Sequence, residues 1–271
     1  FLAERNKEFS KQTEPAVVMT PTTPRPIVAG AEAFYRVALQ ELARSNVPFV
    51  IAGAYAFSAY TGITRATKDL DVFCKASDYP RLLAHFQRLN YAITVEDELW
   101  IAKVHSGAHY IDIIFASPNG VIPVTDDWIN NGRPADVFGT RVQIVGPTEL
   151  LWSKSFIQQH NRYEGADIAH LILKAHEEID WSRLLSYMDA HWEILFAHLI
   201  NFRWIYPSER ACVPSWLMHE LMDRLRIQLE LPPSKRKICR GGMLSPADYL
   251  IDTEEWNFAD FSGKGGAKNA S

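Results

Sequence analysis

The hydrophobic pattern of the chain changes at Gly146–Pro147. Before this point, short apolar runs such as 49–52 alternate with helical patterns such as 31–44, which is typical of strands and helices combined in one unit. After it, nearly every segment up to about residue 231 has the apolar spacing of a helix. The sequence therefore predicts an α+β protein, in which a mixed sheet with flanking helices is followed by a C-terminal helical domain.

The domain boundaries follow from the same pattern. Four prolines lie between residues 13 and 26, and this composition predicts an extended N-terminal tail over 1–26. The α+β core is expected over 27–145 and the helical domain over 146–258. The end of the chain is rich in Gly, Lys and Asn, which predicts a flexible tail over 259–271.

The composition excludes several classes of protein. The 271 residues carry 28 Lys and Arg against 32 Asp and Glu, so the formal net charge is −4, unlike the basic proteins that coat DNA or membranes. The three cysteines are far apart and form no CxxC pair, which is typical of reduced thiols. No segment has the apolar length of a membrane span or the pattern of a secretory signal. We therefore expect a cytoplasmic protein with no membrane partner.

Three aspartates stand where a sheet would bring them together. Asp69 and Asp71 are two residues apart on an expected strand over 69–74, so their side chains project from the same face. Asp112 lies between apolar neighbours in a second strand, an unfavourable place for a carboxylate without a partner. If the two strands are neighbours, the carboxylates converge, and a divalent cation relieves their repulsion. Oxygen ligands favour Mg²⁺ or Mn²⁺ over zinc.

Gly53 stands between the apolar run 49–52 and an expected helix over 54–60. A glycine at such a junction lets a phosphate approach the backbone, where the N–H groups and the dipole of the helix favour anions. A phosphate-binding turn opposite an acidic metal site is typical of enzymes that transfer phosphoryl or nucleotidyl groups.

The motifs Gly53-Ala-Tyr-Ala and Arg65-Ala-Thr-Lys-Asp-Leu-Asp, with Asp112 on a later strand, resemble the signature of the DNA polymerase β-type nucleotidyltransferase superfamily. The resemblance extends from Phe49 to Phe115. It is greatest to the minimal and AbiEii-like bacterial nucleotidyltransferases, which include toxins of toxin–antitoxin systems. One position departs from the family: Ala54 replaces the usual second Gly or Ser, and it keeps the backbone N–H but lacks the hydroxyl.

This resemblance implies an enzyme that transfers a nucleoside monophosphate from an NTP to an acceptor hydroxyl and releases pyrophosphate. It implies that Asp69 and Asp71 hold two Mg²⁺ or Mn²⁺ ions with the bound NTP. Asp112 would bind the catalytic ion and help to activate the acceptor hydroxyl. Gly53 and Ala54 would contact the nucleotide.

The resemblance also reaches the helical half. Lys154 matches the family's lysine-bearing helix, and it would contact the triphosphate. Asp167 matches an aspartate at a helix start, and it would contact the nucleotide or the acceptor. Arg65 would bind phosphate, or else pair with a structural carboxylate. The alternatives are a surface lysine for Lys154 and a helix-dipole interaction for Asp167.

The acceptor stays open between an RNA end such as the tRNA 3′ end, a protein hydroxyl and a small molecule such as an antibiotic. The acidic net charge slightly favours the last two. The resemblance leaves open a toxin with a cognate antitoxin as its partner and a resistance-related enzyme. A second class of function is a nucleotide-binding or interaction module without turnover, which Ala54 would permit. Intact carboxylates favour the enzyme, since their mutual repulsion serves no structural purpose.

Other chemistry-bearing residues are given structural roles. His105 and His109 flank a predicted hairpin turn at Ser106–Gly107, and Asp126 and Asp127 lie in a predicted turn. Four tryptophans at helical spacing are predicted to be core residues: Trp152, Trp181, Trp192 and Trp204.

Overall fold

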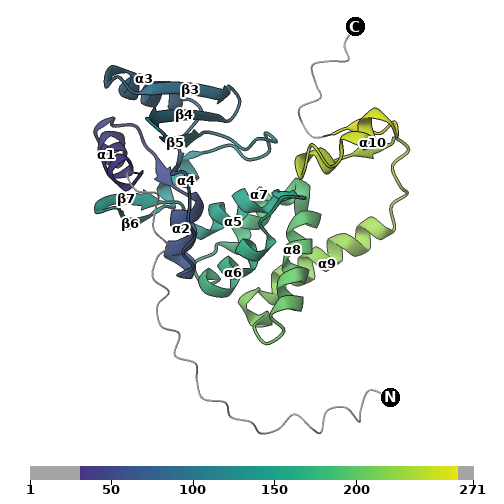
Figure 1. Ribbon diagram of the computed structural model, residues 1–271. Helices are drawn as coiled ribbons and strands as arrows, with labels where there is room; N and C mark the ends of the chain where they lie inside the picture. The colour runs from purple at the N-terminus through teal and green to yellow at the C-terminus, as the bar shows by residue number, and fades with distance from the viewer. Residues whose placement is uncertain (1–30, 262–271) are drawn as a thin grey trace.

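A seven-stranded mixed sheet forms the first half of the protein in a computed structural model that describes residues 31–261 (Figure 1). The expected tail over 1–26 lies outside the described residues, as do residues 262–271. The flexible tail expected from residue 259 begins later than predicted, because Ala259 and Asp260 form a strand that pairs with Ile238 and Cys239. The strands of the seven-stranded sheet are β1 (Val50–Ile51), β2 (Asp71–Phe73), β3 (Ala92–Asp97), β4 (Ile101–Ser106), β5 (His109–Ile114), β6 (Arg133–Val137) and β7 (Thr140–Ile144). Two small sheets of two strands each pair β8 (Gln158–Gln159) with β9 (Arg162–Tyr163), and β10 (Ile238–Cys239) with β11 (Ala259–Asp260).

The order of the strands in the sheet is β3-β4-β5-β2-β1-β7-β6. Strand β2 runs parallel to β5, and β1 runs parallel to β7, whereas the other neighbours are antiparallel. The central strands β1 and β2 are short, and their apolar residues Val50, Ile51 and Val72 are buried. Their outer neighbours in the sheet, β7 and β5, come from later parts of the sequence. This order places the strand that carries Asp71 directly beside the strand that carries Asp112.

Helices flank the sheet and then form the second half of the protein. Helix α1 packs on β5 and β7, α3 packs on β3, and α2 lies between the sheet and helices α5 and α6 (Figure 1). The helices are α1 (Ala31–Arg44), α2 (Gly53–Thr61), α3 (Tyr79–Arg88), α4 (Asp126–Asn130), α5 (Pro147–Ser155), α6 (Gly165–Ala175), α7 (Trp181–Tyr187), α8 (Trp192–Ile205), α9 (Ser215–Leu229) and α10 (Leu250–Glu254). The expected α+β sheet, flanking helices and helical C-terminal region are confirmed.

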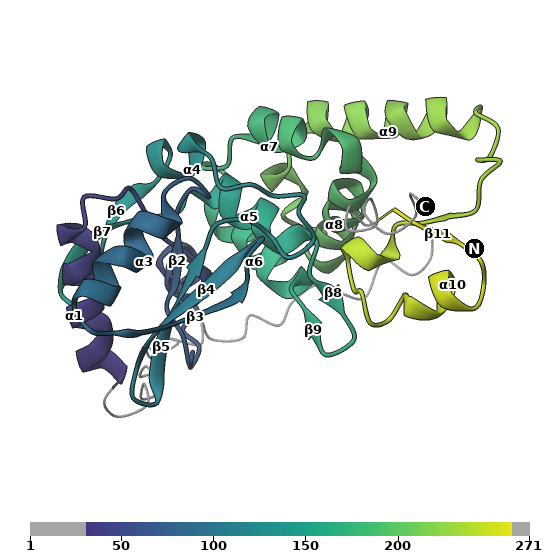
Figure 2. The same ribbon diagram turned by 90° about the horizontal axis from the view of Figure 1, so that it is seen from above.

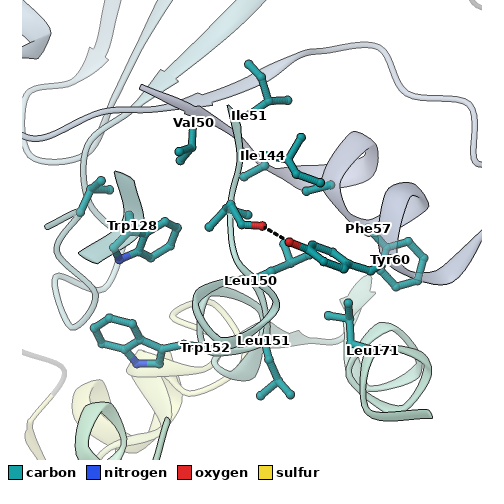
Figure 3. Packing of buried hydrophobic residues seen from close by; sticks show 14 of the residues in the cluster. Val50, Ile51, Phe57, Tyr60, Trp128, Ile144, Leu150, Leu151, Trp152 and Leu171 are labelled. Atoms are coloured by element: carbon teal, nitrogen blue, oxygen red, sulfur yellow. Dashed lines mark hydrogen bonds between the residues drawn. The ribbon is translucent and has the colours of Figure 1, made fainter. Parts of the chain in front are cut away.

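One continuous apolar core joins the sheet to the helical half (Figure 3). Val50 and Ile144 of the sheet face Leu150 of α5, and the hydroxyl of Tyr60 on α2 donates a 2.9 Å hydrogen bond to the carbonyl of Val145. Because α2 and α5 both belong to this core, the helical half is held at a defined position against the strands that carry the aspartates.

Helix α5 ends at Ser155, because β8 and β9 form a small hairpin after it. Two local predictions are wrong. Asp126 and Asp127 begin the short helix α4, where acidic side chains favour the helix dipole. Trp204 is 82% exposed, whereas Trp152 and Trp181 are buried as expected. Helix α8 is apolar nearly all round, so its sequence alone does not indicate which face is buried.

The last part of the chain extends away from the sheet. Figure 2 shows the long helix α9 running beyond α8, with α10 on the return path. In the range 31–261, none of the helices combines the length and apolar character needed to span a bilayer.

Candidate active site

The aspartates Asp71 and Asp112 are direct neighbours in the sheet. They are register partners of the parallel pair β2–β5, and the N–H of Asp112 donates a 3.0 Å hydrogen bond to the carbonyl of Leu70. Asp112 is only 6% exposed, whereas Leu70 and Val72 point to the other face and are fully buried. The predicted convergence of these two strands is therefore present in the structure.

Gly53 brings the start of α2 into contact with the same carboxylate. Its φ of +55° lies in the left-handed region, and a Cβ built on it would lie 1.7 Å from Oδ2 of Asp71. The N–H of Ala52 also donates to the carbonyl of Asp71 at 3.0 Å. The helix N-terminus with its unpaired N–H groups thus begins beside the acidic group, and only glycine fits at the contact. Ala54 follows in the first turn and is partly exposed.

Asp69 lies just before β2 and is fixed by the turn that precedes it. The hydroxyl of Thr67 donates a 2.5 Å hydrogen bond to Oδ1 of Asp69, and the hydroxyl of Tyr35 donates at 2.8 Å to the carbonyl of Lys68. Burial, together with the charges of Asp69 and Asp112, raises the pKa of Asp71 to about 7. The three carboxylates therefore interact electrostatically, as the sequence predicts.

A lysine that sequence reasoning missed belongs to this acidic group. The ammonium of Lys103 on β4 lies 3.2 Å from Oδ1 of Asp112 and 3.5 Å from Oε2 of Glu96. Burial raises the pKa of Asp112 above its ordinary value, and the charge of Lys103 opposes this shift. The hairpin register was the available signal, since pairing across Gly107 places residue 103 opposite residue 112.

The residues predicted from the helical half form a second, charged group. The ammonium of Lys154 lies 2.7 Å from Oε2 of Glu164 and 2.9 Å from Oδ2 of Asp167. Arg65 pairs with Oδ1 of Asp167 at 2.6 Å, and Arg162 pairs with Oε1 of Glu164 at 2.8 Å. Three cations thus face two carboxylates, which leaves one positive charge in excess.

The alternative of a surface position for Lys154 is wrong, because the residue is 8% exposed and Asp167 is 4% exposed. Arg65 pairs with the carboxylate of Asp167, and its expected role in binding phosphate stays a prediction. Glu164 was not predicted. Burial alone would raise its pKa, but its ion pair with Lys154 and its hydrogen bond from Arg162 hold that pKa well below the ordinary value.

The ring of Phe57 on α2 lies against two cations of the basic group. Its ring centroid lies 5.0 Å from the guanidinium carbon of Arg65 and 5.5 Å from the ammonium of Lys154. The positive charges of Arg162 and Lys154 also lower the pKa of Asp71, against the larger effects of its burial and of the other aspartates. The basic group therefore lies within electrostatic range of Asp71.

The acidic group suits a divalent cation by its chemistry rather than as a preassembled cage. Across residues 31–261, no three His, Cys, Asp or Glu side chains are grouped as a metal site, so the predicted convergence of Asp69, Asp71 and Asp112 into one metal-binding group is not seen there. The donors are carboxylate oxygens, the ligands that Mg²⁺ and Mn²⁺ prefer. Burial, and after it the charges of Asp69 and Asp112, raise the pKa of Asp71, and a bound cation would relieve the repulsion among these carboxylates. The residues therefore fit such an ion.

Comparison with known proteins gives distant structural likenesses. No family model and no curated protein matches the sequence. Similar solved structures include the antibiotic-resistance factor ANT(2'')-Ia, with 15% identity, TM-score 0.44 and coverage of 63% of this chain and 97% of that one. An antigenic nucleotidyltransferase-like protein from Paracoccidioides brasiliensis has 15% identity, TM-score 0.43 and coverage of 69% and 94%. The lincosamide antibiotic adenylyltransferase LnuA has 18% identity, TM-score 0.37 and coverage of 54% and 98%. Likenesses this distant assign neither an activity nor a substrate to this chain.

Proposed function

We propose that the protein is a metal-dependent nucleotidyltransferase that moves a nucleoside monophosphate from an NTP to an acceptor hydroxyl. One observation carries this proposal: the N-terminus of α2 meets the carboxylate of Asp71 at Gly53, with Asp112 beside it in register. A helix N-terminus attracts phosphate, and paired carboxylates attract divalent cations. Their contact at one glycine favours a nucleotide triphosphate with its metal.

The residues divide the reaction between them. The backbone at Gly53 and Ala54 would bind phosphate oxygens, and Lys154 with Arg65 and Arg162 would supply the neighbouring positive charge. Asp69, Asp71 and Asp112 would hold two Mg²⁺ or Mn²⁺ ions, which neutralise the developing phosphate charge. The acceptor oxygen forms a bond to the α-phosphorus as the bond to the β-phosphate oxygen breaks. Pyrophosphate leaves, and Asp112 takes the proton of the acceptor hydroxyl.

Asp167 holds Lys154 and Arg65 in this arrangement, so we assign it the role of positioning the basic group. The acceptor stays open between an RNA end, a protein and a small molecule. The AbiEii-like branch and a cognate antitoxin remain predictions from the sequence. The second candidate, a nucleotide-binding module without turnover, shares the phosphate-binding turn and differs only in lacking transfer.

NTP with Mg²⁺ is expected to raise the thermal stability of the wild-type protein. At about 100 times the dissociation constant, linkage gives roughly 2.7 kcal/mol, which corresponds to a shift of several degrees. Gly53→Ala should lose this shift, because the new methyl group displaces the carboxylate of Asp71 from the helix start. The measurement is differential scanning fluorimetry with and without NTP and Mg²⁺.

Gly62→Ala is the matched control. Gly62 ends the same helix with φ +72°, but a Cβ there would meet nothing within 4 Å. Both variants therefore acquire left-handed strain of about 1 kcal/mol, and only Gly53→Ala disturbs the site. An undiminished nucleotide shift in Gly53→Ala would contradict the placement of the phosphates at this turn.

A further inference from the structure

The side chain of Lys103 lies inside the acidic group, where a bound cation would be expected. We infer that Lys103 is a positioning residue that competes with the divalent cation for Asp112, so that the cation has to displace its ammonium group. This inference rests on the proposed function, because it concerns the same carboxylates. The ammonium group of Lys103 places a positive charge within the site, and this charge weakens the binding of divalent cations.

The register of the sheet fixes this contact. Lys103 is directly opposite Asp112 in the antiparallel pair β4–β5, where side chains of opposite residues are neighbours on one face. Both side chains are well buried, at 15% and 9% exposure. A lysine held there by the strand pairing cannot be separated from Asp112 by movement of a surface loop.

The divalent cation and the ammonium group of Lys103 would compete for one oxygen, Oδ1 of Asp112. Oδ1 of Asp112 is buried, and it accepts no hydrogen bond from the described residues. The ion pair with the ammonium group of Lys103 is its contact among those residues. A carboxylate oxygen that faces an ammonium group at 3.2 Å leaves no room for a metal ion on that side. Occupation of this oxygen by a metal therefore requires Lys103 to move.

The structure also provides a place for the displaced ammonium group. Glu96 on the neighbouring strand β3 lies 3.5 Å from the Nζ of Lys103, and the ring centroid of Tyr110 lies 4.1 Å from it. Glu96 is half-exposed, so it can follow the lysine without leaving a buried charge. The flexible stem and compact charge of lysine suit this movement, whereas the larger planar group of arginine does not.

The test measures Mn²⁺ binding without nucleotide, by electron paramagnetic resonance of free Mn²⁺ at mildly alkaline pH. Lys103→Met should bind Mn²⁺ about 10-fold more tightly than the wild type, because one charged partner no longer has to be displaced. Lys103→Arg keeps the charge and should bind no more tightly than the wild type. Lys75→Met is the matched control, since Lys75 pairs with Asp78 and Asp126 instead and its loss changes the net charge equally.

The variant Asp71→Asn distinguishes the proposed cation site from the competition by Lys103. If Asp71→Asn loses Mn²⁺ while Lys103→Met binds it no better than the wild type, the cation site stands and the competition by Lys103 is wrong. If Lys75→Met gains as much affinity as Lys103→Met, the effect is one of net charge, and the inference is wrong. If neither the wild type nor Lys103→Met binds Mn²⁺, both the inference and the proposed cation site are contradicted.

Discussion

Replacement of Asp71 by asparagine is expected to abolish nucleotidyl transfer while the metal-free protein becomes more stable. Asp71 is the carboxylate that touches both Gly53 and the neighbour Asp112, so its loss removes charge from the centre of the site. We expect transfer to fall by about 100- to 1,000-fold or more, the size measured for preorganised electrostatic groups. Stability should rise because the repulsion with Asp69 and Asp112 is removed.

The gain in stability should depend on pH. The pKa of Asp71 is about 7 in the folded protein, against an ordinary value of 3.8, so the folded state holds this proton more tightly than the unfolded state. The contribution of this group to the free energy of unfolding is therefore complete below about pH 4 and is lost as the pH rises to about 7. Asp71→Asn does not lose this stability as the pH rises. Its free energy of unfolding should therefore exceed that of the wild type by about 1 kcal/mol or more at mildly alkaline pH.

Thermal and urea unfolding in EDTA, at mildly acidic and mildly alkaline pH, measures both effects. Asp126→Asn is a matched control, because Asp126 pairs with Lys75 on the surface and should leave transfer unchanged. A loss of stability in Asp71→Asn at alkaline pH, together with retained transfer, would show that the carboxylate is structural.

Replacement of Lys154 by methionine is expected to lower the free energy of unfolding by about 3 kcal/mol, the size measured when one partner of a buried ion pair is removed. The variant leaves Glu164 and Asp167 with only their arginine partners, although Asp167 is buried and the side chain of Glu164 is only 12% exposed. The nucleotide-induced thermal shift should be lost as well, because the variant lacks one of the positive charges assigned to the phosphates of the NTP.

The variant Arg162→Met tests whether burial of the ion pair is the reason for the loss of stability expected in Lys154→Met. Arg162 also pairs with Glu164, but its side chain is 64% exposed. The loss of an exposed partner should cost less than about 1 kcal/mol. Urea unfolding of the two variants gives the comparison. Equal effects in Lys154→Met and Arg162→Met would contradict the buried network as the cause.

The sequence was sufficient for the part of the site that depends on local spacing. Gly53 follows a short apolar strand, as the pattern predicts. Asp69 lies before β2 rather than on it, so the expected strand over 69–74 is shorter, and the contact of Gly53 with Asp71 depends on the pairing of β1 with β2. The pairing of β2 with β5 was a condition of the argument from the sequence, and the structure meets it. A carboxylate between isoleucines needs a partner, and Lys103 on β4 supplies it.

The remaining contacts depend on packing between distant segments. Lys154, Arg65 and Asp167 meet only because α2, α5 and α6 share one core, and no spacing in the sequence encodes that arrangement. The sequence therefore suggested an exposed lysine as the alternative, where the structure has a buried one. Lys103 differs, because the hairpin at Gly107 determines its partner. The register of that hairpin would have placed it opposite Asp112.

The most direct test of the proposed activity is the fate of a label on the NTP. Each of the four NTPs, labelled with ³²P at the α- or the γ-phosphate, is incubated with Mg²⁺ or Mn²⁺ and wild-type or Asp71→Asn protein. Separate reactions contain total RNA, a protein extract, or a panel of hydroxyl-bearing antibiotics as acceptors. We predict that α-label from at least one NTP enters one acceptor class, that γ-label is released as pyrophosphate, and that Asp71→Asn transfers neither. Transfer of γ-label to the acceptor, or equal α-labelling by Asp71→Asn, would contradict nucleotidyl transfer at this site.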